Sequence, residues 1–280
     1  MYVSQILSGR VLEVDVLTGE TTEVVGEQSG GQQAWGLEYY VMDDVGYLVV
    51  AGGGPSYGTG SAEAYMYNAE TGELIVTCQP ISSNVTGLGA FINDVTIVDD
   101  VAFLTDSFND HLMVMSLPEA RNGNCEISEI PLPNSFVPSS SADWGANGIV
   151  SYDDGLLVSN EIEGTVFFLP ELEDVLDGDI PIFYEIIRDA LGADGLTVVE
   201  DRLYVTQNTE NKIGVYELSF DKKLLKATNM GNLTASDFDT PATSAVYDGY
   251  VYSTNARFVT MPDLTDTEAE FGLVVVEDDL

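Results

Sequence analysis

Short runs in which apolar and polar residues alternate, separated by acidic turns, recur along the chain. The clearest example is the stretch 91–110, where apolar runs at 95–98 and 101–104 flank the pair Asp99-Asp100. This pattern predicts two short strands joined by a tight turn. Because antiparallel strands return the chain to the side from which it started, the polar residues at the two outer ends are expected on one face.

Similar hairpins recur at a period of about 50 residues, which is typical of propeller blades. Their inner strands open at aligned positions that are 58, 54, 47 and 49 residues apart, namely Trp35, Asn93, Asn147, Asp194 and Thr243. Third strands are predicted at 10–15, 64–68, 111–115, 165–169 and 212–218. Fourth strands are predicted at 22–25, 74–77, 125–130 and 183–187. Four short strands in each repeat also match a propeller blade.

We therefore predict an all-β fold, a six-bladed β-propeller with four-stranded antiparallel blades, in a single domain. The blades are predicted at about 1–30, 31–84, 85–138, 139–189, 190–236 and 237–280. A propeller usually closes by pairing strands from both ends of the chain, yet the first blade begins at its second strand, residues 1–4. We expect that the first blade is incomplete and that an N-terminal segment is missing. The alternative is a looser closure in which residues 1–4 are displaced inward.

The charge of the chain limits the kinds of partner that it is expected to bind. Nine Lys and Arg residues stand against 47 Asp and Glu residues, which gives a net charge of −38. Such a surface repels nucleic acid and anionic membranes, so neither is expected as a partner. No apolar run reaches the 18 or so residues of a membrane-spanning helix. The acidic residues are dispersed through turns and loops, which favours a solvated coat suited to a salty or calcium-rich medium.

Cysteines and glycosylation sequons favour an extracellular or secretory location. Cys78 and Cys125 fall in predicted outer strands of adjacent blades, so we expect them to be bridged or close, provided that their Cα atoms lie within about 7 Å. Sequons begin at Asn84 and Asn232, both in loop-like stretches, and make these residues candidates for glycosylation.

Three of the opening residues carry oxygen donors: Asn93, Asn147 and Asp194. Because they begin the inner strands of three consecutive predicted blades, we expect them to converge at the central channel. Amide and carboxylate oxygens suit Ca²⁺ or another divalent cation. The alternative is that Asn147 and Asp194, each followed by glycine, are ordinary turn residues that tolerate unusual backbone dihedrals.

Short motifs along residues 36–258 resemble those of the regucalcin/gluconolactonase-like six-bladed propellers. They are Asn93-Asp94-Val95, Thr105-Asp106-Ser107, Asn147-Gly148-Ile149 and Asp194-Gly195-Leu196. Two later motifs, Gln207-Asn208 and the stretch 255–258, are similar to those of a secreted, uncharacterised branch of that family.

The resemblance implies a divalent cation in the channel, held by a Glu, an Asn and an Asp. A further Asn contacts the substrate or a metal-bound water. The matching residues are Asn147 and Asp194 for the metal and Asn93 for the contact. No residue matches the Glu, because the strand that would carry it is not in this sequence.

Other residues near the opening positions are candidates with competing interpretations. His111 is the only histidine, and it follows Asp106 closely enough for a proton-shuttle role, although a surface or packing role is the commoner one. Arg257 would bind an anionic group of a substrate, or pair with a neighbouring carboxylate. Trp35 and Trp144 would line a pocket or stack on a sugar ring, and core packing is the alternative for both.

Two classes of function follow from these residues. The first is a metal-dependent lactone or ester hydrolase, in which Asp194, or Asp106 acting through water, serves as the base. The second is a non-catalytic extracellular propeller that binds a small molecule, a carbohydrate-like ligand or a protein. One fold can carry either function, so the choice depends on the site.

Overall fold

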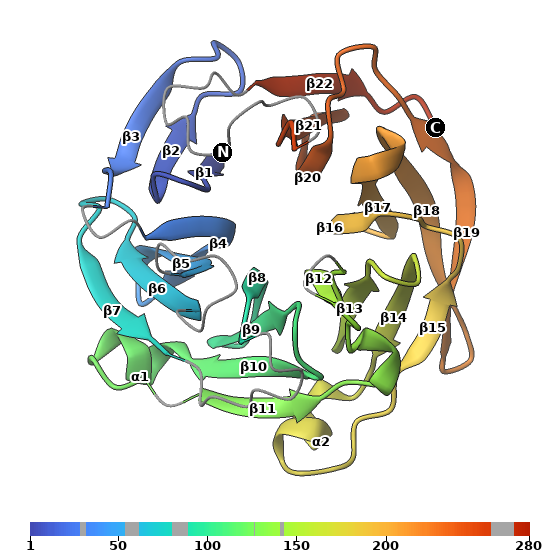
Figure 1. Cartoon of the computed structure of the whole chain (residues 1–280), viewed down its shortest axis with the longest axis horizontal. Coiled ribbons are helices and arrows are strands. Elements are labelled where there is room, and N and C mark those ends of the chain that lie inside the picture. The colour runs from blue at the N-terminus through green and yellow to red at the C-terminus, as the bar shows by residue number, and fades with distance from the viewer. Residues whose placement is uncertain (29–31, 54–61, 80–88, 126, 141–142, 259–271) are drawn as a thin grey trace. The chain divides into compact units, whose positions relative to one another are not determined.

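The computed structural model describes residues 1–28, 32–53, 62–79, 89–125, 127–140, 143–258 and 272–280. The chain forms two compact units, Met1–Gly145 and Ala146–Leu280. Each unit holds three antiparallel sheets, and every pair of neighbouring strands in a sheet is consecutive in sequence (Figure 1). These sheets are the blades of a six-bladed β-propeller fold, three in each unit, so the predicted fold class is confirmed.

The first unit contains one sheet of three strands and two sheets of four. The strands are β1 (Tyr2–Gln5), β2 (Arg10–Val14), β3 (Thr21–Val25), β4 (Gln33–Met42), β5 (Val45–Gly53), β6 (Ala62–Asn68), β7 (Leu74–Cys78), β8 (Ile92–Val98), β9 (Val101–Asp106), β10 (His111–Ser116) and β11 (Ile127–Pro131). The helix α1 (Leu117–Arg121) and the 3₁₀ turn η1 (Asn134–Phe136) are short additions.

The second unit contains two sheets of four strands and one of three. The strands are β12 (Ala146–Tyr152), β13 (Gly155–Asn160), β14 (Thr165–Leu169), β15 (Tyr184–Ile187), β16 (Ala193–Val199), β17 (Arg202–Gln207), β18 (Lys212–Asp221), β19 (Leu224–Leu233), β20 (Pro241–Tyr247), β21 (Tyr250–Asn255) and β22 (Leu273–Glu277). The helix α2 (Leu172–Leu176) and the 3₁₀ turn η2 (Asn208–Glu210) complete it. None of the helices in the described residues is long and apolar enough to cross a membrane.

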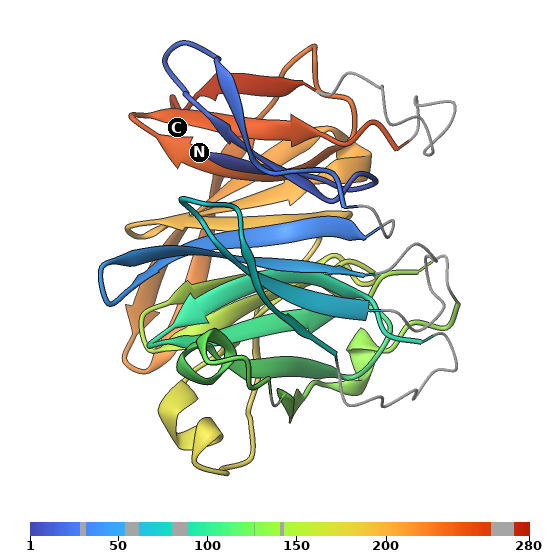
Figure 2. The same ribbon diagram turned by 90° about the vertical axis from the view of Figure 1, so that its left-hand side faces the viewer.

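The observed strands follow the predicted pattern with one clear omission. The predicted strands 95–98 and 101–104 lie within β8 and β9, and the other hairpins are also present. The strand β19 was not predicted. It follows a turn at Lys222, which has a φ of 64°, a left-handed conformation that Gly, Asn or Asp usually adopts. The strands of each sheet are visibly twisted relative to one another (Figure 2).

Acidic residues form the tight turns of the hairpins, as predicted. Asp43 and Asp44 have φ of 52° and 63°, and Asp99 and Asp100 have φ of 47° and 64°. Successive positive φ values are typical of the two-residue turns that match the twist of a hairpin. Asp tolerates them better than most residues, which explains part of the acidic composition.

The inner strand of five sheets contains a β-bulge at its start. The register shifts so that two residues of the inner strand oppose one residue of the next strand. The bulged pairs are Trp35-Gly36, Asn93-Asp94, Asn147-Gly148, Asp194-Gly195 and Ala242-Thr243. In four of the five pairs, the first residue is the opening position predicted from the sequence. In the last sheet the alignment was wrong by one residue, because Ala242 and not Thr243 occupies that position.

Apolar residues pack between neighbouring sheets within each unit. In the first unit, Met66, Leu104 and Met113 belong to one buried cluster that joins the second and third sheets. In the second unit, Phe168 and Leu203 belong to a corresponding cluster. The sheets therefore alternate with layers of core, which holds the bulged ends of the inner strands in fixed positions.

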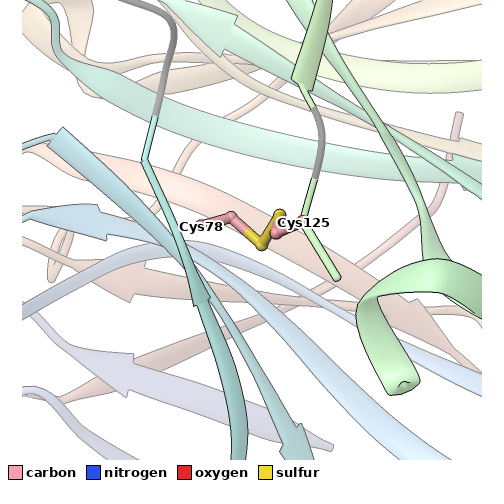
Figure 3. Close-up of a disulfide and its surroundings, with 2 residues drawn as sticks. All are labelled: Cys78 and Cys125. Atoms are coloured by element: carbon pink, nitrogen blue, oxygen red, sulfur yellow. A yellow bond between two sulfur atoms is a disulfide. The ribbon is translucent and has the colours of Figure 1, made fainter. Parts of the chain in front are cut away.

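A disulfide joins Cys78 to Cys125, with a Cα–Cα distance of 5.5 Å (Figure 3). It connects the end of β7 to the segment before β11, and this is the pairing expected from the sequence. Closing a loop with a sequence separation of 47 stabilises the folded state by about 4 kcal/mol in the chain-entropy description. The sequon residue Asn232 is exposed on β19, whereas Asn84 lies outside the described residues.

Candidate functional site

Glycine follows the opening residue in two inner strands of the second unit. A Cβ atom on Gly148 would lie 2.3 Å from the backbone oxygen of Asp194, and one on Gly195 would lie 2.4 Å from Thr243 Oγ1. The glycines are therefore required by the close approach of β12 to β16 and of β16 to β20. This packing brings the bulges that carry Asn147 and Asp194 close together.

Opening residues in three sheets each bond a side chain that follows 14 residues later. In the first unit, Asn93 Nδ2 donates to Ser107 Oγ at 3.0 Å. In the second unit, Asn147 Nδ2 donates to Glu161 Oε2 at 2.6 Å, and Asp194 Oδ2 accepts from the Nδ2 of Asn208 at 3.1 Å. Each later residue directly follows the last residue of the second strand. The two ends of each of these hairpins therefore meet as a polar pair, whereas the sequence predicted only that both ends lie on one face.

Glu161 links the two polar pairs of the second unit. Besides its bond to Asn147, its carboxylate is hydrogen-bonded to the side chain of Asn208, which also holds Asp194. Asn147 and Asn208 are 4% and 7% exposed, and both carboxylates are half-buried. We call Asn147, Glu161, Asp194 and Asn208 the Glu161–Asp194 cluster.

Burial controls the ionisation of Glu161. Loss of solvation raises the pKa of its carboxyl above the usual value, and the hydrogen bonds from Asn147 and Asn208 oppose this rise only in part. A carboxyl group in this position holds its proton more tightly than one in water. The cluster therefore favours either a proton on Glu161 or a positive charge beside it.

The donor set of the cluster fits a hard divalent cation. The carboxylates of Glu161 and Asp194 are oxygen donors, and a 180° turn of the Asn147 amide would add its oxygen. Asn208 is engaged differently, because its Oδ1 accepts a hydrogen bond from the backbone N–H of Thr209 at 2.5 Å. It therefore positions the two carboxylates. Among the described residues, no group of three or more His, Cys, Asp or Glu side chains is arranged to hold a metal ion.

Asp106, predicted as an alternative base acting through water, is buried and held by hydrogen bonds. It is 0% exposed, and its Oδ1 accepts hydrogen bonds from the backbone N–H groups of Phe91 and Phe108, both at 3.0 Å. Its Oδ2 accepts from Asn109 Nδ2 at 2.7 Å. These contacts fix the β9–β10 connection, and action of Asp106 as a base through water stays a prediction.

His111 lies in the same buried region. Its Nε2 is 3.6 Å from Asp106 Oδ2 and 3.7 Å from Glu129 Oε1, and its Nδ1 is 3.9 Å from Asp110 Oδ1. The side chain is 6% exposed, which agrees with the packing interpretation of this lone histidine.

Trp35 and Trp144 pack against the same phenylalanine in the first unit. Both rings meet Phe91 edge-on, with centroid distances of 4.8 and 4.6 Å, and Trp144 also stacks on Phe108 at 5.3 Å. Phe91 and Phe108 are buried, whereas both tryptophans are half-buried. Packing is therefore one role of each tryptophan, and ligand binding by Trp144 stays a prediction.

Arg257 pairs with a neighbouring carboxylate, which was one of the two roles predicted for this residue. Its Nε lies 3.3 Å from Asp239 Oδ2, and its backbone N–H donates to the Asp239 carbonyl at 3.0 Å. The pairing keeps the side chain beside the β19–β20 connection. Binding of a substrate by Arg257 and by Asn93 stays a prediction.

Glu161 was not among the predicted site residues, and Asn208 was named only as part of the motif Gln207-Asn208. Each directly follows the last residue of a second strand, Asn160 of β13 and Gln207 of β17, so the signal was present in the position after each second strand. The β-bulge was not predicted. It sets the spacing that brings the residue after the second strand against the opening residue of the inner strand.

Fold and site together define a class of protein, an all-β propeller with a cluster of buried amides and half-buried carboxylates at the bulged ends of its inner strands. No protein-family profile and no curated protein matches the sequence.

Solved structures do match the fold. The chain is similar to one in a nidogen–laminin complex, with 15% identity, a TM-score of 0.61, and coverage of 91% of this chain and 84% of that one. It is similar to the periplasmic gluconolactonase of Pseudomonas aeruginosa, with 13% identity, a TM-score of 0.61, and coverage of 88% and 69%. It is also similar to a streptogramin B lyase, with 14% identity, a TM-score of 0.55, and coverage of 90% and 74%. At these identities the likeness establishes the propeller fold and leaves the activity open.

Proposed function

We propose that the protein is a secreted, divalent-cation-dependent hydrolase of lactones or esters whose site is the Glu161–Asp194 cluster. The observation that carries this proposal is the placement of two half-buried carboxylates on one buried amide, Asn208. Two like charges in this position are costly unless a proton or a cation balances them. The likeness in fold to a gluconolactonase and the disulfide, which is typical of oxidising compartments, add support.

In this proposal Asn147 and Asp194 hold the cation, and Glu161 handles a proton. When bound, the cation would polarise the substrate carbonyl and promote attack by water. Glu161 accepts the proton of that water and returns it to the alkoxide oxygen that leaves when the acyl C–O bond breaks, a role that suits a carboxyl group whose pKa burial has raised. Asn208 keeps the two carboxylates in position.

Calorimetric titration of metal-stripped protein with Ca²⁺, followed by assays on a panel of lactones and aryl esters, tests the proposal. We expect saturable binding, weakened at least about tenfold by Asp194→Asn because it removes a charged ligand. Glu161→Gln should abolish hydrolysis. Glu163→Gln is the matched control, since it removes one charge from an exposed position on the same turn. An unchanged isotherm for Asp194→Asn would show that the cluster is only a turn motif.

The second candidate is a non-catalytic extracellular binding propeller. It is favoured by the likeness in fold to a chain that was solved in a protein complex, that of nidogen with laminin. Binding of Ca²⁺ without hydrolysis of any lactone or ester would support this candidate over the enzyme.

A further inference from the structure

A groove in the first unit lies apart from the residues of the proposed hydrolase site in sequence and in chemistry. Its volume is about 490 Å³, and residues of the β1–β3 sheet and the β4–β7 sheet line it. Tyr2 and Tyr39 provide the aromatic surface, and Glu13, Glu23 and Glu70 provide the charge. This volume is within the range of small-ligand sites and would hold one long side chain.

The two tyrosine rings of the groove form an ordered stack. Their centroids are 5.3 Å apart with an interplanar angle of 23°, and Tyr39 is 45% exposed. Gly46 makes this arrangement possible, because a Cβ atom there would lie 2.8 Å from the Tyr39 hydroxyl oxygen and 2.9 Å from a ring carbon. The Tyr39 ring therefore lies close along the backbone and presents an aromatic surface to the groove.

The carboxylates of the groove differ in whether they form an ion pair. Glu23 is paired with Arg10, whose Nε lies 3.3 Å from Glu23 Oε2. Glu13 and Glu70 form no ion pair within 4.0 Å among the described residues, and both are exposed. Burial, and after it the charge of Glu13, raises the pKa of the Tyr2 hydroxyl, which places that charge near the ring stack. The groove thus combines π-faces with carboxylates that can still pair.

We propose that this groove binds the guanidinium group of an arginine side chain from a partner protein. An aromatic ring beside carboxylates attracts an organic cation through both the ring quadrupole and charge pairing. Arginine fits better than lysine, because its planar group stacks on a ring while its N–H groups bond to carboxylates. The net charge of −38 steers basic partners toward the surface, and the rings then select among them.

The proposal is tested with the whole chain and three short peptides that differ only in a central arginine, lysine or citrulline. Binding is measured at 150 mM salt by NMR, from the shifts of the tyrosine ring signals. We expect saturable binding of the arginine peptide, weaker binding of the lysine peptide and none of the neutral citrulline peptide. Tyr39→Leu should weaken arginine binding about two- to fivefold, the range expected for an exposed cation–π contact. Glu13→Gln should weaken it to a similar extent.

The matched control is the pair Tyr250 and Glu277, which are cross-strand partners in the last sheet and do not line the groove. Tyr250→Leu and Glu277→Gln make the same chemical changes and should leave binding unchanged. Equal weakening by the groove and control variants would mean general attraction to an acidic surface and would overturn the proposal. So would equal affinity for the arginine and lysine peptides, or the absence of saturation. Circular dichroism of each variant confirms that the fold is intact.

Discussion

Glu38 in β4 is a carboxyl group whose ionisation is opposed by its surroundings in the first unit. Its pKa is raised from 4.5 to about 7, chiefly by burial and also by the charge of Asp94. Hydrogen bonds from the Thr96 side chain and the Ile97 backbone, both on β8, limit the rise. The charged form is therefore costly in the folded state, even though two donors from the neighbouring strand hold it.

The cost can be worked from the shift in pKa. At about 1.4 kcal/mol for each pH unit, the rise from 4.5 to about 7 corresponds to about 3 kcal/mol. Below pH 4.5 the carboxyl of Glu38 is protonated in both the folded and the unfolded chain, so there is no penalty. Between pH 4.5 and 7 only the unfolded chain loses this proton, and stability falls as the pH rises. Above pH 7 the penalty stays constant.

Glu38→Gln should remove this penalty, because glutamine keeps the shape and its oxygen can accept the same hydrogen bonds. We expect the variant to match the wild type near pH 4 and to exceed its free energy of unfolding by up to about 3 kcal/mol at pH 8. Urea unfolding at several pH values measures the difference. Glu20→Gln, at an exposed turn in the same unit, is the control for general charge effects. A difference that does not change with pH, or a destabilised variant at pH 8, would refute the reasoning.

Three further predictions follow from the disulfide, the cluster and the bulges. Replacement of Cys78 and Cys125 by alanine should lower the free energy of unfolding by about 2–5 kcal/mol. Reduction of the disulfide in the wild type, checked by mass spectrometry, should lower it by a similar amount. Because burial raises the pKa of Glu161, Ca²⁺ binding should release protons and should strengthen as the pH rises. Calorimetry in buffers of different ionisation enthalpy measures the proton release, which should be smaller in Glu161→Gln. Gly148→Ala should cost about 1–3 kcal/mol in thermal or urea unfolding, because its Cβ would lie 2.3 Å from a backbone oxygen, whereas Gly272→Ala meets nothing within 4 Å and should be nearly neutral.

Much of the fold could be predicted from the sequence, because the hairpins depend on local signals. Alternating apolar residues set the strands, and acidic residues with positive φ, such as Asp99 and Asp100, set the turns. The strand β19 was missed because its turn uses a lysine in a conformation that lysine rarely adopts. The opening residues Asn147 and Asp194 were found from the repeat, since their positions follow from the period of the hairpins.

The chemistry of the site could be predicted only in part, because it depends on contacts between strands. Nothing local to Glu161 distinguishes it from Glu163 two residues later, yet only Glu161 follows the strand end that faces the bulge. The pKa of Glu38 likewise depends on burial against β8, which the alternation of residues in β4 does not reveal. Distances across a bulge and the loss of solvation are properties of packing, and they enter only with the structure.

Relative to the repeated bulge, the polar residues that hold the loops and those that form the site occupy two different, adjacent positions. In four of the five sheets that contain a bulge, the thirteenth residue after the first bulged residue ends the second strand, and the fourteenth lies just beyond it. The thirteenth positions are Asp106, Asn160, Gln207 and Asn255, all buried. Asp106 and Asn255 bond the backbone of nearby connections, and Gln207 does so through the Leu191 carbonyl.

The fourteenth positions meet the opening residues instead. They are Ser107, Glu161 and Asn208, each in a different sheet. Because adjacent residues of an extended chain point to opposite sides, one position braces the loop while the next faces the bulge. A substitution at a fourteenth position therefore changes the polar pair at the bulge without removing a hydrogen bond that holds the loop. This accounts for the different polar pairs on one repeated backbone geometry.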